Sequence, residues 1–392
     1  MHNNCFLVNK SLLFDNFADM KIKLDQEERK DFLNYLENIY QNEERDEALN
    51  DLLTLDGKVF KGNVSGNPSL DEALASTCFS LYEDPLDKEA DIAFYYDEYL
   101  PFLAKQRTLY ETSFLSSLPY FRLLNGLENK KKGTISFEKV TYEPYQIFLS
   151  DDRVKEEGLS SFTPIGAFRE RVSYPAIKKK GRIWMSLIPH EINTMAKPFS
   201  AFKGHVLLYG LGIGYAAYEA SEKSDVTKVT IVDNDHNVIA LFKELMLPLF
   251  PHKEKIEIIE GDALEFASKT KNKQTYEVLF ADLWHDGMDG LPLYASLIRN
   301  EGNAKRNFYW VENDILEYYS RLYIRYLLSI FEDDRDFRMA ANDYGSEVAS
   351  IFISLSESDK NKTLSSIKAI MDEFKIESLR KNIASSVALN LP

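Results

Sequence analysis

The glycine-rich segment at residues 206–220 constrains the fold of this chain more than any other stretch. Its sequence is VLLYGLGIGYAAYEA, in which an apolar run meets three alternating glycines, Gly210, Gly212 and Gly214, called the glycine turn below. Such an apolar run is typical of a buried strand, and alternating glycines let the main chain turn tightly beside a ligand. The helix that follows would direct its first amides at that ligand. The segment therefore predicts a strand, a ligand-binding turn and a helix.

The residue after the glycine turn narrows the class of ligand. A dinucleotide-binding fingerprint has glycine or alanine three residues after the second glycine of its pair. In this chain that position is occupied by Tyr215. The G-x-G-x-G form therefore fits a nucleoside site better than a pyrophosphate site.

Three further strands are predicted after the glycine turn, and each ends in an acidic residue. They cover residues 226–235, 256–264 and 276–286, and their ends carry Asp233, Asp262 followed by Ala263, and Asp282. Helices are predicted between them, at residues 215–223, 236–249 and 263–270. Open parallel sheets bind ligands at the carboxyl ends of their strands, and a carboxylate there can accept both hydroxyls of a ribose. The succession predicts an α/β fold with a doubly wound, mostly parallel Rossmann-like sheet.

This succession resembles the class I S-adenosylmethionine-dependent methyltransferases, and most closely their spermidine-synthase-like branch, over residues 184–312. The resemblance implies a Rossmann-like methyltransferase sheet with S-adenosylmethionine as the cofactor. It also implies that the glycine turn holds the methionine part and that Asp233 binds the ribose. Asp262 with Ala263 would then bind the adenine, and Asp282 would lie at the reacting end.

The segment ADLWHDGMDGLPLY at residues 281–294 carries the candidate catalytic side chains. Its glycine content is costly in a helix, so we expect a loop at the end of the fourth strand. Transfer from a sulfonium is an in-line displacement, for which the protein supplies positioning and, where needed, a base. Asp282 would orient the acceptor, while His285 or Asp286 would take its proton. In the alternative interpretation Asp282 caps the loop, Trp284 packs on the adenine or in the core, and His285 is polar surface.

Three functions are compatible with this pattern. The leading hypothesis is an S-adenosylmethionine-dependent methyltransferase that acts on a small or cationic acceptor. The first alternative is an aminopropyltransferase, although the segment lacks the Asp-Ser-Ser-Asp-Pro run of a spermidine synthase and places the bulky Trp284 where a slender amine would thread. The second alternative is a non-catalytic, nucleoside-binding regulatory protein, because a fold does not guarantee turnover.

The chain as a whole divides into three predicted parts. Residues 1–128 are predicted to form a helical N-terminal domain and residues 129–195 a small β-rich element. Residues 196–392 are predicted to form the Rossmann-like nucleoside-binding domain with C-terminal helices. The helical part has no catalytic spacing, so we interpret it as a cap or a homodimer interface.

Local signals support this division. Two helices of the first part are predicted to begin with capping boxes, formed by Asp25 with Glu28 and by Ser69 with Glu72. Residues 168–187 are predicted to form a hairpin that turns at residues 178–181. The lysine runs at residues 130–132 and 178–180 lie at predicted turns, where they are either solvated or an anion site.

Two segments flank the core of the resemblance. The segment WMSLIPHEINTM at residues 184–195 leads into the first strand, and the resemblance implies that His190 and Glu191 pack over the nucleoside. Alternatively, Pro189 ends the β-rich element and His190 begins a helix as an exposed polar residue. Beyond the candidate loop we expect a fifth strand, then a helix, then an element of undecided type, at residues 307–314, 315–331 and 348–355.

Composition narrows the partners and the compartment. The formal net charge of -15 over 392 residues repels polyanions, so we expect no extended contact with nucleic acid or an anionic membrane and favour a small or cationic substrate. Cys5 and Cys78 cannot build a disulfide framework, and no zinc-ligand spacing occurs, so no metal site is predicted. The given sequence does not open with a basic, apolar and cleavage-site succession, and it contains no apolar run of membrane-spanning length, so we expect a cytoplasmic, soluble protein.

Overall fold

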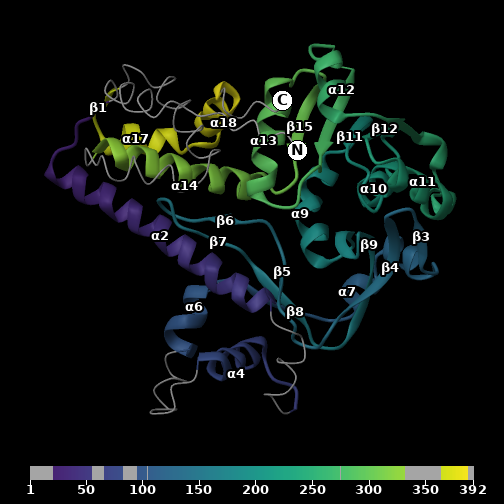
Figure 1. The fold of residues 1–392 in the computed structure, drawn as a ribbon, viewed down its shortest axis with the longest axis horizontal. Coiled ribbons are helices and arrows are strands. Elements are labelled where there is room, and N and C mark those ends of the chain that lie inside the picture. Colours follow the sequence, from purple (N-terminus) through teal and green to yellow (C-terminus); the bar gives the residue numbers. More distant parts are fainter. Residues whose placement is uncertain are drawn as a thin grey trace, which may run out of the picture. The chain divides into compact units, whose positions relative to one another are not determined.

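The computed structural model describes residues 21–54, 66–82, 95–103, 105–273, 275–331 and 363–386, and Figure 1 labels those helices and strands for which there is room. The chain divides into two compact units. The larger comprises Tyr40–Leu283 and Glu301–Asn313, and the smaller comprises Met1–Ile39, Trp284–Asn300 and Asp314–Pro392. Cys5 and the undecided element at residues 348–355 lie outside the described residues.

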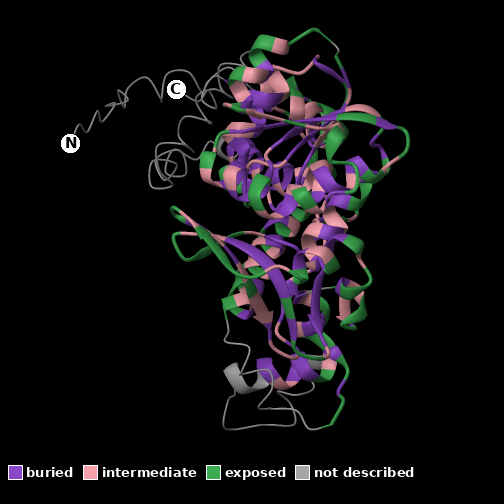
Figure 2. Ribbon diagram, turned by 90° about the vertical axis from the view of Figure 1, so that its right-hand side faces the viewer, coloured by how far each residue is buried: buried purple, intermediate pink, exposed green. Residues whose placement is uncertain are grey.

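The larger unit contains a parallel sheet with the strand order β13-β12-β11-β14-β15. The strand bounds are Gly204–Tyr209 for β11, Val226–Asp233 for β12, Ile256–Glu260 for β13, Tyr276–Ala281 for β14 and Ala304–Tyr309 for β15. The apolar residues 206–209 of β11 are fully buried, as a sheet covered on both faces requires. Figure 2 colours the ribbon by burial, with buried residues in purple. The structure thus confirms an α/β class with a parallel, Rossmann-like sheet.

The helices between these strands match the predicted ones. Helices α10, α11 and α12 follow β11, β12 and β13 and cover Tyr215–Glu222, His236–Leu241 and Ala263–Thr270 (Figure 1). Helix α11 continues through a π turn, η2 (Phe242–Met246), and a 3-10 turn, η3 (Leu247–Leu249), before the short η4 (Lys253–Lys255). Each helix returns the chain to the edge where the next parallel strand begins.

The fifth strand lies earlier in the sequence than predicted. We expected it at residues 307–314, but β15 covers Ala304–Tyr309 and pairs with β14 from Ala304 to Tyr309. The backbone leaves the extended conformation at Val311, where φ is +44°. Helix α14 (Glu312–Phe331) begins there, so Glu312 and Asp314, which fall within the predicted strand, belong to a helix. The polar run at residues 305–307 concealed the start of the strand.

An antiparallel sheet, β10-β9-β4-β3, forms much of the predicted β-rich part. Its strands are β3 (Lys130–Lys132), β4 (Ile135–Tyr142), β9 (Val172–Lys179) and β10 (Arg182–Ser186). The predicted hairpin is formed by β9 and β10, and its two turn residues, Lys180 and Gly181, have φ of 51° and 82°. Positive φ at both positions is the geometry of a type I′ turn. Smaller sheets are formed by β2 (Arg107–Tyr110), β5 (Phe148–Leu149) and β8 (Ile165–Phe168), and by β6 (Val154–Lys155) and β7 (Ser161–Phe162).

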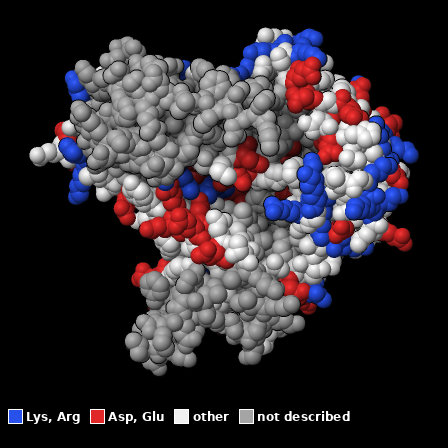
Figure 3. Space-filling view, viewed as in Figure 1, with Lys and Arg blue, Asp and Glu red and all other residues white. Residues whose placement is uncertain are grey.

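The two lysine runs lie on this antiparallel sheet, in the part of the molecule where Figure 3 shows a group of basic side chains. Four of these lysines form salt bridges with carboxylates: Lys130 and Lys132 with Glu244, Lys178 with Glu138, and Lys179 with Asp235. These acids neutralise much of the charge of the runs, which favours ordinary surface lysines over an anion site.

The segment before the β-rich part is mainly helical where it is described. Its helical elements are α2 (Gln26–Thr54), α4 (Leu70–Tyr82), η1 (Tyr95–Tyr99), α6 (Leu100–Leu103), α7 (Ser113–Ser116) and α8 (Pro119–Asn125). Both predicted capping boxes form, since the amides of Glu28 and Glu72 donate to Asp25 and Ser69 at 2.9 and 3.2 Å. Strand β2 also lies in this range and pairs with β8, so helix is not continuous to residue 128. The domain boundaries at 128 and 195 stay predictions.

The smaller unit contains α13 (Gly287–Arg299), most of α14, α17 (Ile367–Glu373) and α18 (Ile376–Ser385). The strands β1 (Lys21–Ile22) and β16 (Thr363–Leu364) pair in parallel beside them. Helix α13 packs on α18, and the Arg299 guanidinium donates to the Ser386 carbonyl at 2.9 Å. Across both units, no described helix has the length and apolar character that crossing a membrane demands.

Candidate functional site

The carboxyl ends of β11 and β14 approach each other so closely that only glycine fits between them. A Cβ at Gly210 would lie 2.0 Å from the carbonyl oxygen of Asp282, and Gly210 has φ of +90°. The Asp282 amide donates to the carbonyl of Tyr209 at 2.9 Å, which fixes this approach. The strand order reverses its direction between β11 and β14, and open α/β sheets bind ligands at such a switch point.

The other two glycines of the turn have different surroundings. A Cβ at Gly214 would lie 2.5 Å from the ring of Phe242 and 2.8 Å from the hydroxyl of Tyr120, so this glycine serves close packing. A Cβ at Gly212 would meet no atom within 4 Å. The main chain at Gly212 therefore faces open space, as a turn that accommodates a ligand against bare backbone would.

Tyr120 of α8 braces the glycine turn from behind. Its hydroxyl donates to the carbonyl of Ile213 at 2.6 Å, and its ring stacks on that of Tyr218 with 4.6 Å between centroids. The side chain is fully buried, and burial raises the pKa of the phenol well above its ordinary value, which keeps it a hydrogen donor. Nothing in the local sequence marks this tyrosine, because it lies far from the turn along the chain.

Asp233 ends β12 beside the glycine turn, as predicted. Its two carboxylate oxygens accept hydrogen bonds from the amides of Leu211 and Asp235, each at 2.8 Å, and its side chain is almost buried. Burial raises its pKa, while these two amide bonds oppose the shift. Because a carboxylate oxygen has two lone pairs, each oxygen can still accept one ribose hydroxyl. This arrangement suits the predicted role, which stays a prediction.

Asp262 and Ala263 follow β13 on the next strand. The amide of Gly261 donates to the Asp233 carbonyl at 2.9 Å, which holds the end of β13 beside that of β12. Asp262 is exposed and caps α12, accepting from the amide of Glu265 at 2.8 Å, while Ala263 is buried as the first residue of that helix. The second carboxylate oxygen of Asp262 accepts no hydrogen bond from the described residues. The structure thus brings the glycine turn, Asp233 and the Asp262 segment to one edge of the sheet.

Glu191 is a second acid near Asp282. It lies in the first turn of α9 (Pro189–Ser200), and its Oε1 accepts from the amide and the hydroxyl of Ser186 at 3.1 and 3.0 Å. Burial, and then the charge of Asp282, raise the pKa of the Glu191 carboxyl to about 8, against which the Ser186 bonds act. An acid whose pKa is raised by burial and by a second acid is typical of a functional site.

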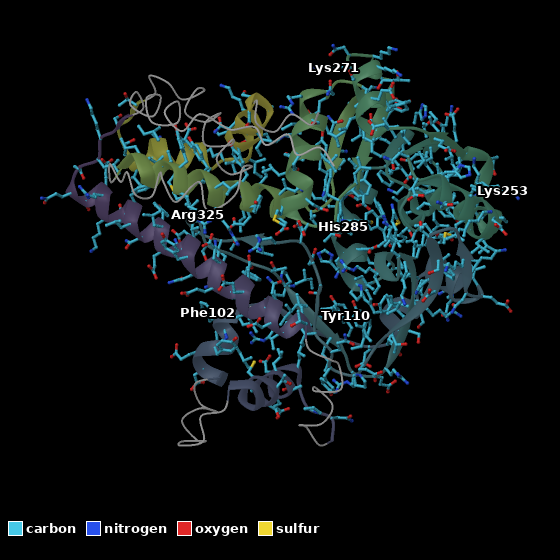
Figure 4. All side chains as sticks on the ribbon, in the orientation of Figure 1. Phe102, Tyr110, Lys253, Lys271, His285 and Arg325 are labelled. Carbon is cyan, nitrogen blue, oxygen red and sulfur yellow. The ribbon has the colours of Figure 1, made fainter. Side chains whose placement is uncertain are left out.

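Helix α9 begins at Pro189, as one of our two interpretations proposed. His190 is nevertheless half-buried, and its ring lies 5.8 Å from that of Trp310. The helix is anchored by Asn193, whose side-chain amide donates to the carbonyl of Ser150 at 2.7 Å and to the hydroxyl of Tyr110 at 3.1 Å (Tyr110 is labelled in Figure 4). The acid of this pair, Glu191, therefore sits on a well-fixed helix start.

Three buried tyrosines lie within range of the charge of the Glu191 carboxyl. They come from β4, β9 and α10 and are Tyr142, Tyr174 and Tyr215, all buried. Burial raises the pKa of each phenol, that of Tyr174 to about 12, and the charge of Glu191 adds to each shift. The rings of Tyr142 and Tyr174 lie 4.6 Å apart. No pattern in the sequence connects these residues, which lie far apart along the chain.

The prediction of a loop over residues 281–294 is wrong from Gly287 onward, where α13 begins. Glycines are tolerated there since close packing requires them: a Cβ at Gly287 would lie 2.6 Å from the Asp314 carbonyl oxygen, and one at Gly290 would lie 2.8 Å from the Trp284 ring. Trp284 is buried and also contacts Tyr294, which fits the core interpretation of this residue.

His285 and Asp286 have local structural partners in the smaller unit. Asp286 caps α13, accepting from the amides of Met288 and Asp289 at 2.9 and 3.0 Å, and Asp289 completes the capping box. The Nδ1 of His285 lies 2.9 Å from the Asp289 carboxylate (His285 is labelled in Figure 4). These contacts explain both residues without chemistry, so their catalytic roles stay predictions.

Comparison with known proteins gives distant likeness. No protein-family model matches the chain, and no curated protein does. Among solved structures, the chain is similar to spermidine synthase from Thermotoga maritima, at 15% identity over 38% of this chain and 59% of that one, with a TM-score of 0.29. It is also similar to a probable spermidine synthase from Corynebacterium glutamicum (16% identity, 39% and 62% covered, TM-score 0.28). A third similar structure is a spermidine synthase in complex with the transition-state analogue AdoDATO (17%, 32% and 48%, 0.24). This chain thus spans 48–62% of the length of these proteins.

Proposed function

We propose that this protein is a transferase that binds a sulfonium nucleoside of the S-adenosylmethionine type and passes one of its alkyl groups to a small cationic acceptor. The observation that carries the proposal is the strand-end geometry at the switch point. Open space at Gly212 lies beside Asp233, whose oxygens each keep a lone pair for a ribose hydroxyl. The exposed Asp262 on the adjacent strand end would bind the adenine.

For alkyl transfer from a sulfonium, the main contribution of the protein is to position the two reactants. A sulfonium is already an activated leaving group, so transfer proceeds by attack of the acceptor in line with the breaking carbon–sulfur bond. Holding the two reactants in that alignment supplies most of the rate advantage. Asp282 follows β14 directly beside the glycine turn and would hold the acceptor there.

The acids of the site, Glu191 and Asp282, bear on whether the protein transfers a methyl or an aminopropyl group. Methyl transfer from S-adenosylmethionine is our leading proposal, and it requires room for the carboxylate of the methionine part. Aminopropyl transfer is the second candidate, since the decarboxylated cofactor lacks that carboxylate. Glu191 and Asp282 would repel the carboxylate of the methionine part. Asp282 raises the pKa of Glu191, and no lysine or arginine in the described part of the chain lowers it. This observation supports the second candidate.

Ligand binding and product analysis together test the proposal. We expect S-adenosylmethionine or its decarboxylated form to raise the melting temperature, because a ligand of the native state stabilises it by mass action, whereas NAD should not. Calorimetric binding of NAD without binding of either sulfonium would overturn the nucleoside assignment. With an amine present, S-adenosylhomocysteine as product identifies methyl transfer, and methylthioadenosine with a lengthened amine identifies aminopropyl transfer.

A further inference from the structure

The carboxyl group of Glu191 is fixed on one side and available on the other. Its Oε1 accepts both hydrogen bonds from Ser186, while its Oε2 accepts none from the described residues. The side chain is half-buried, so part of it remains accessible to solvent. A carboxylate with one oxygen anchored and one oxygen free has the geometry for accepting an N–H from a ligand.

A polar group without a partner points to the same place. Tyr215 is 6% exposed, its charge interaction with Glu191 places the two side chains near each other, and its hydroxyl makes no hydrogen bond to the described residues. This oxygen is not among the enclosed polar atoms that lack a partner, so it reaches solvent, where a ligand atom can meet it. Its oxygen can accept a second N–H of the same ligand.

The rings around Glu191 suit a cation. The charge of Glu191 acts on the buried phenols of Tyr142 and Tyr174, whose rings lie 4.6 Å apart, and ring faces attract ammonium groups, more strongly where water is scarce. Asp282 adds a second acid nearby, and two close carboxyls are stabilised either by sharing one proton or by binding a cation. Acceptor oxygens, aromatic faces and a carboxyl pair together match a primary or secondary ammonium group.

We propose that Glu191 binds the ammonium group of the acceptor and takes the proton that must leave before transfer, a role that rests on the function proposed above. The Glu191 carboxylate removes one N–H proton from the ammonium and becomes a carboxylic acid. The freed nitrogen lone pair attacks the sulfonium carbon, a nitrogen–carbon bond forms, and the carbon–sulfur electron pair moves onto sulfur. The products are a neutral thioether nucleoside and an alkylated ammonium that carries the positive charge, and Glu191 then returns its proton to solvent.

Calorimetry of amine binding tests the proposal without turnover. The protein is saturated with methylthioadenosine, which lacks the transferable group, and titrated with putrescine at pH 7 in two buffers of different ionisation enthalpy. Since the empty carboxyl is mostly protonated at this pH, with a pKa of about 8, we expect binding to release about one proton. Glu191→Gln should release none, because its amide does not titrate.

A matched control separates Glu191 from other acids of the same region. Glu138 of β4 pairs with Lys178, whose hydrogen bond holds the pKa of that carboxyl below its usual value, so Glu138→Gln should release the same proton as the parent. Putrescine that does not bind, that binds without proton release, or that releases the same proton from Glu191→Gln would each overturn the role of Glu191. If neither methylthioadenosine nor S-adenosylhomocysteine binds, the proposed function and this role fall together, whereas loss of methylthioadenosine binding alone removes aminopropyl transfer.

The pH dependence of transfer provides a second test. Its midpoint would not shift if Glu191 had only a structural role. Ser186→Ala removes the hydroxyl bond that stabilises the Glu191 carboxylate but leaves the backbone amide in place. The pKa of Glu191 should therefore rise, and the pH at which transfer reaches half its maximum should rise with it. An unchanged midpoint in Ser186→Ala would overturn the assignment of the titrating group to Glu191.

Discussion

The glycines of the turn make different contacts, so they should respond differently to substitution. Gly212→Ala places a methyl group in the open space reserved for the ligand, and we expect at least a tenfold loss of nucleoside affinity, about 1.4 kcal/mol. Gly214→Ala overlaps Phe242 and strains a left-handed residue, so it should lower the free energy of unfolding by about 2–5 kcal/mol.

Calorimetric titration and thermal unfolding of both variants check this contrast. Each glycine variant serves as the control of the other, since both carry the cost of a left-handed alanine. If Gly212→Ala binds nucleoside as tightly as the parent, the ligand does not approach this turn.

Asp233→Asn should weaken nucleoside binding by about 1–3 kcal/mol, the usual scale for losing a charge-assisted hydrogen bond. Asparagine keeps one carbonyl oxygen for a backbone amide, which limits the effect on folding. Glu260→Gln is the matched control, because Glu260 lies opposite Asp233 at the end of the neighbouring strand and is exposed. Equal affinity in the Asp233 and Glu260 variants would place the ribose elsewhere.

The raised pKa of Glu191 predicts how stability depends on pH. The unfolded carboxyl titrates near its ordinary value of 4.5 and the folded one at about 8, so the folded state binds more protons between them. The free energy of unfolding should therefore fall as pH rises from about 5 to about 8 and level off above.

Glu191→Gln should lack this component, so denaturant unfolding of parent and variant across that pH range isolates it. The raised pKa of Asp233 has the same sign but is common to both proteins. Parallel pH curves for parent and variant would show that Glu191 titrates at its ordinary value in the folded protein.

At the scale of elements, variants of Asp286 at the start of α13 distinguish a helix-capping role from a catalytic one. Asp286→Ala removes both hydrogen bonds to the first amides of the helix and should cost about 1 kcal/mol of stability, measured by thermal unfolding. Asp286→Ser preserves the capping ability and should recover most of that loss. If Asp286 also takes a proton from the acceptor, both variants should lose turnover, whereas a capping role alone leaves the serine variant active.

Elements with strong local patterns could be predicted from the sequence, and those fixed by distant contacts could not. The glycine turn, the strands before Asp233 and Asp282, and the β9–β10 hairpin follow from apolar runs and turn residues. Helix α13 was missed because its two glycines are favoured by contacts with Asp314 and Trp284, which no local propensity contains. The polar face of β15 hid its start for a similar reason.

At the scale of the molecule, the net charge of -15 should draw a cationic acceptor toward the site. Raising the ionic strength from about 0.02 M to about 0.3 M shortens the Debye length from roughly 20 Å to roughly 6 Å, so putrescine affinity should fall over that range. Calorimetry measures this, with 1,4-butanediol as an uncharged control of the same length. A putrescine affinity that does not change with salt would show that charge does not guide the acceptor.

In the candidate site, too, some residues could be predicted from the local sequence, whereas others are brought together only by packing. The acids at the strand ends could be predicted, because a parallel fold brings successive carboxyl ends to one edge. The tyrosines around Glu191 belong to strands β4 and β9 and helix α10, and only the packing of three elements makes them neighbours. The resemblance offered Glu191 as one of two interpretations. Sequence periodicity describes one element at a time, so it could not indicate the surroundings of Glu191.

The contact between Gly210 and the carbonyl of Asp282 has an evolutionary consequence. In the proposed function, the glycine turn holds the donor and Asp282 holds the acceptor. Only main-chain atoms set the distance between the two. Substitutions among the residues that line the acceptor side can then change which molecule is modified, while descendants inherit the direction of attack unaltered. A lineage with this contact would diversify its substrates readily and would rarely change its glycine at position 210.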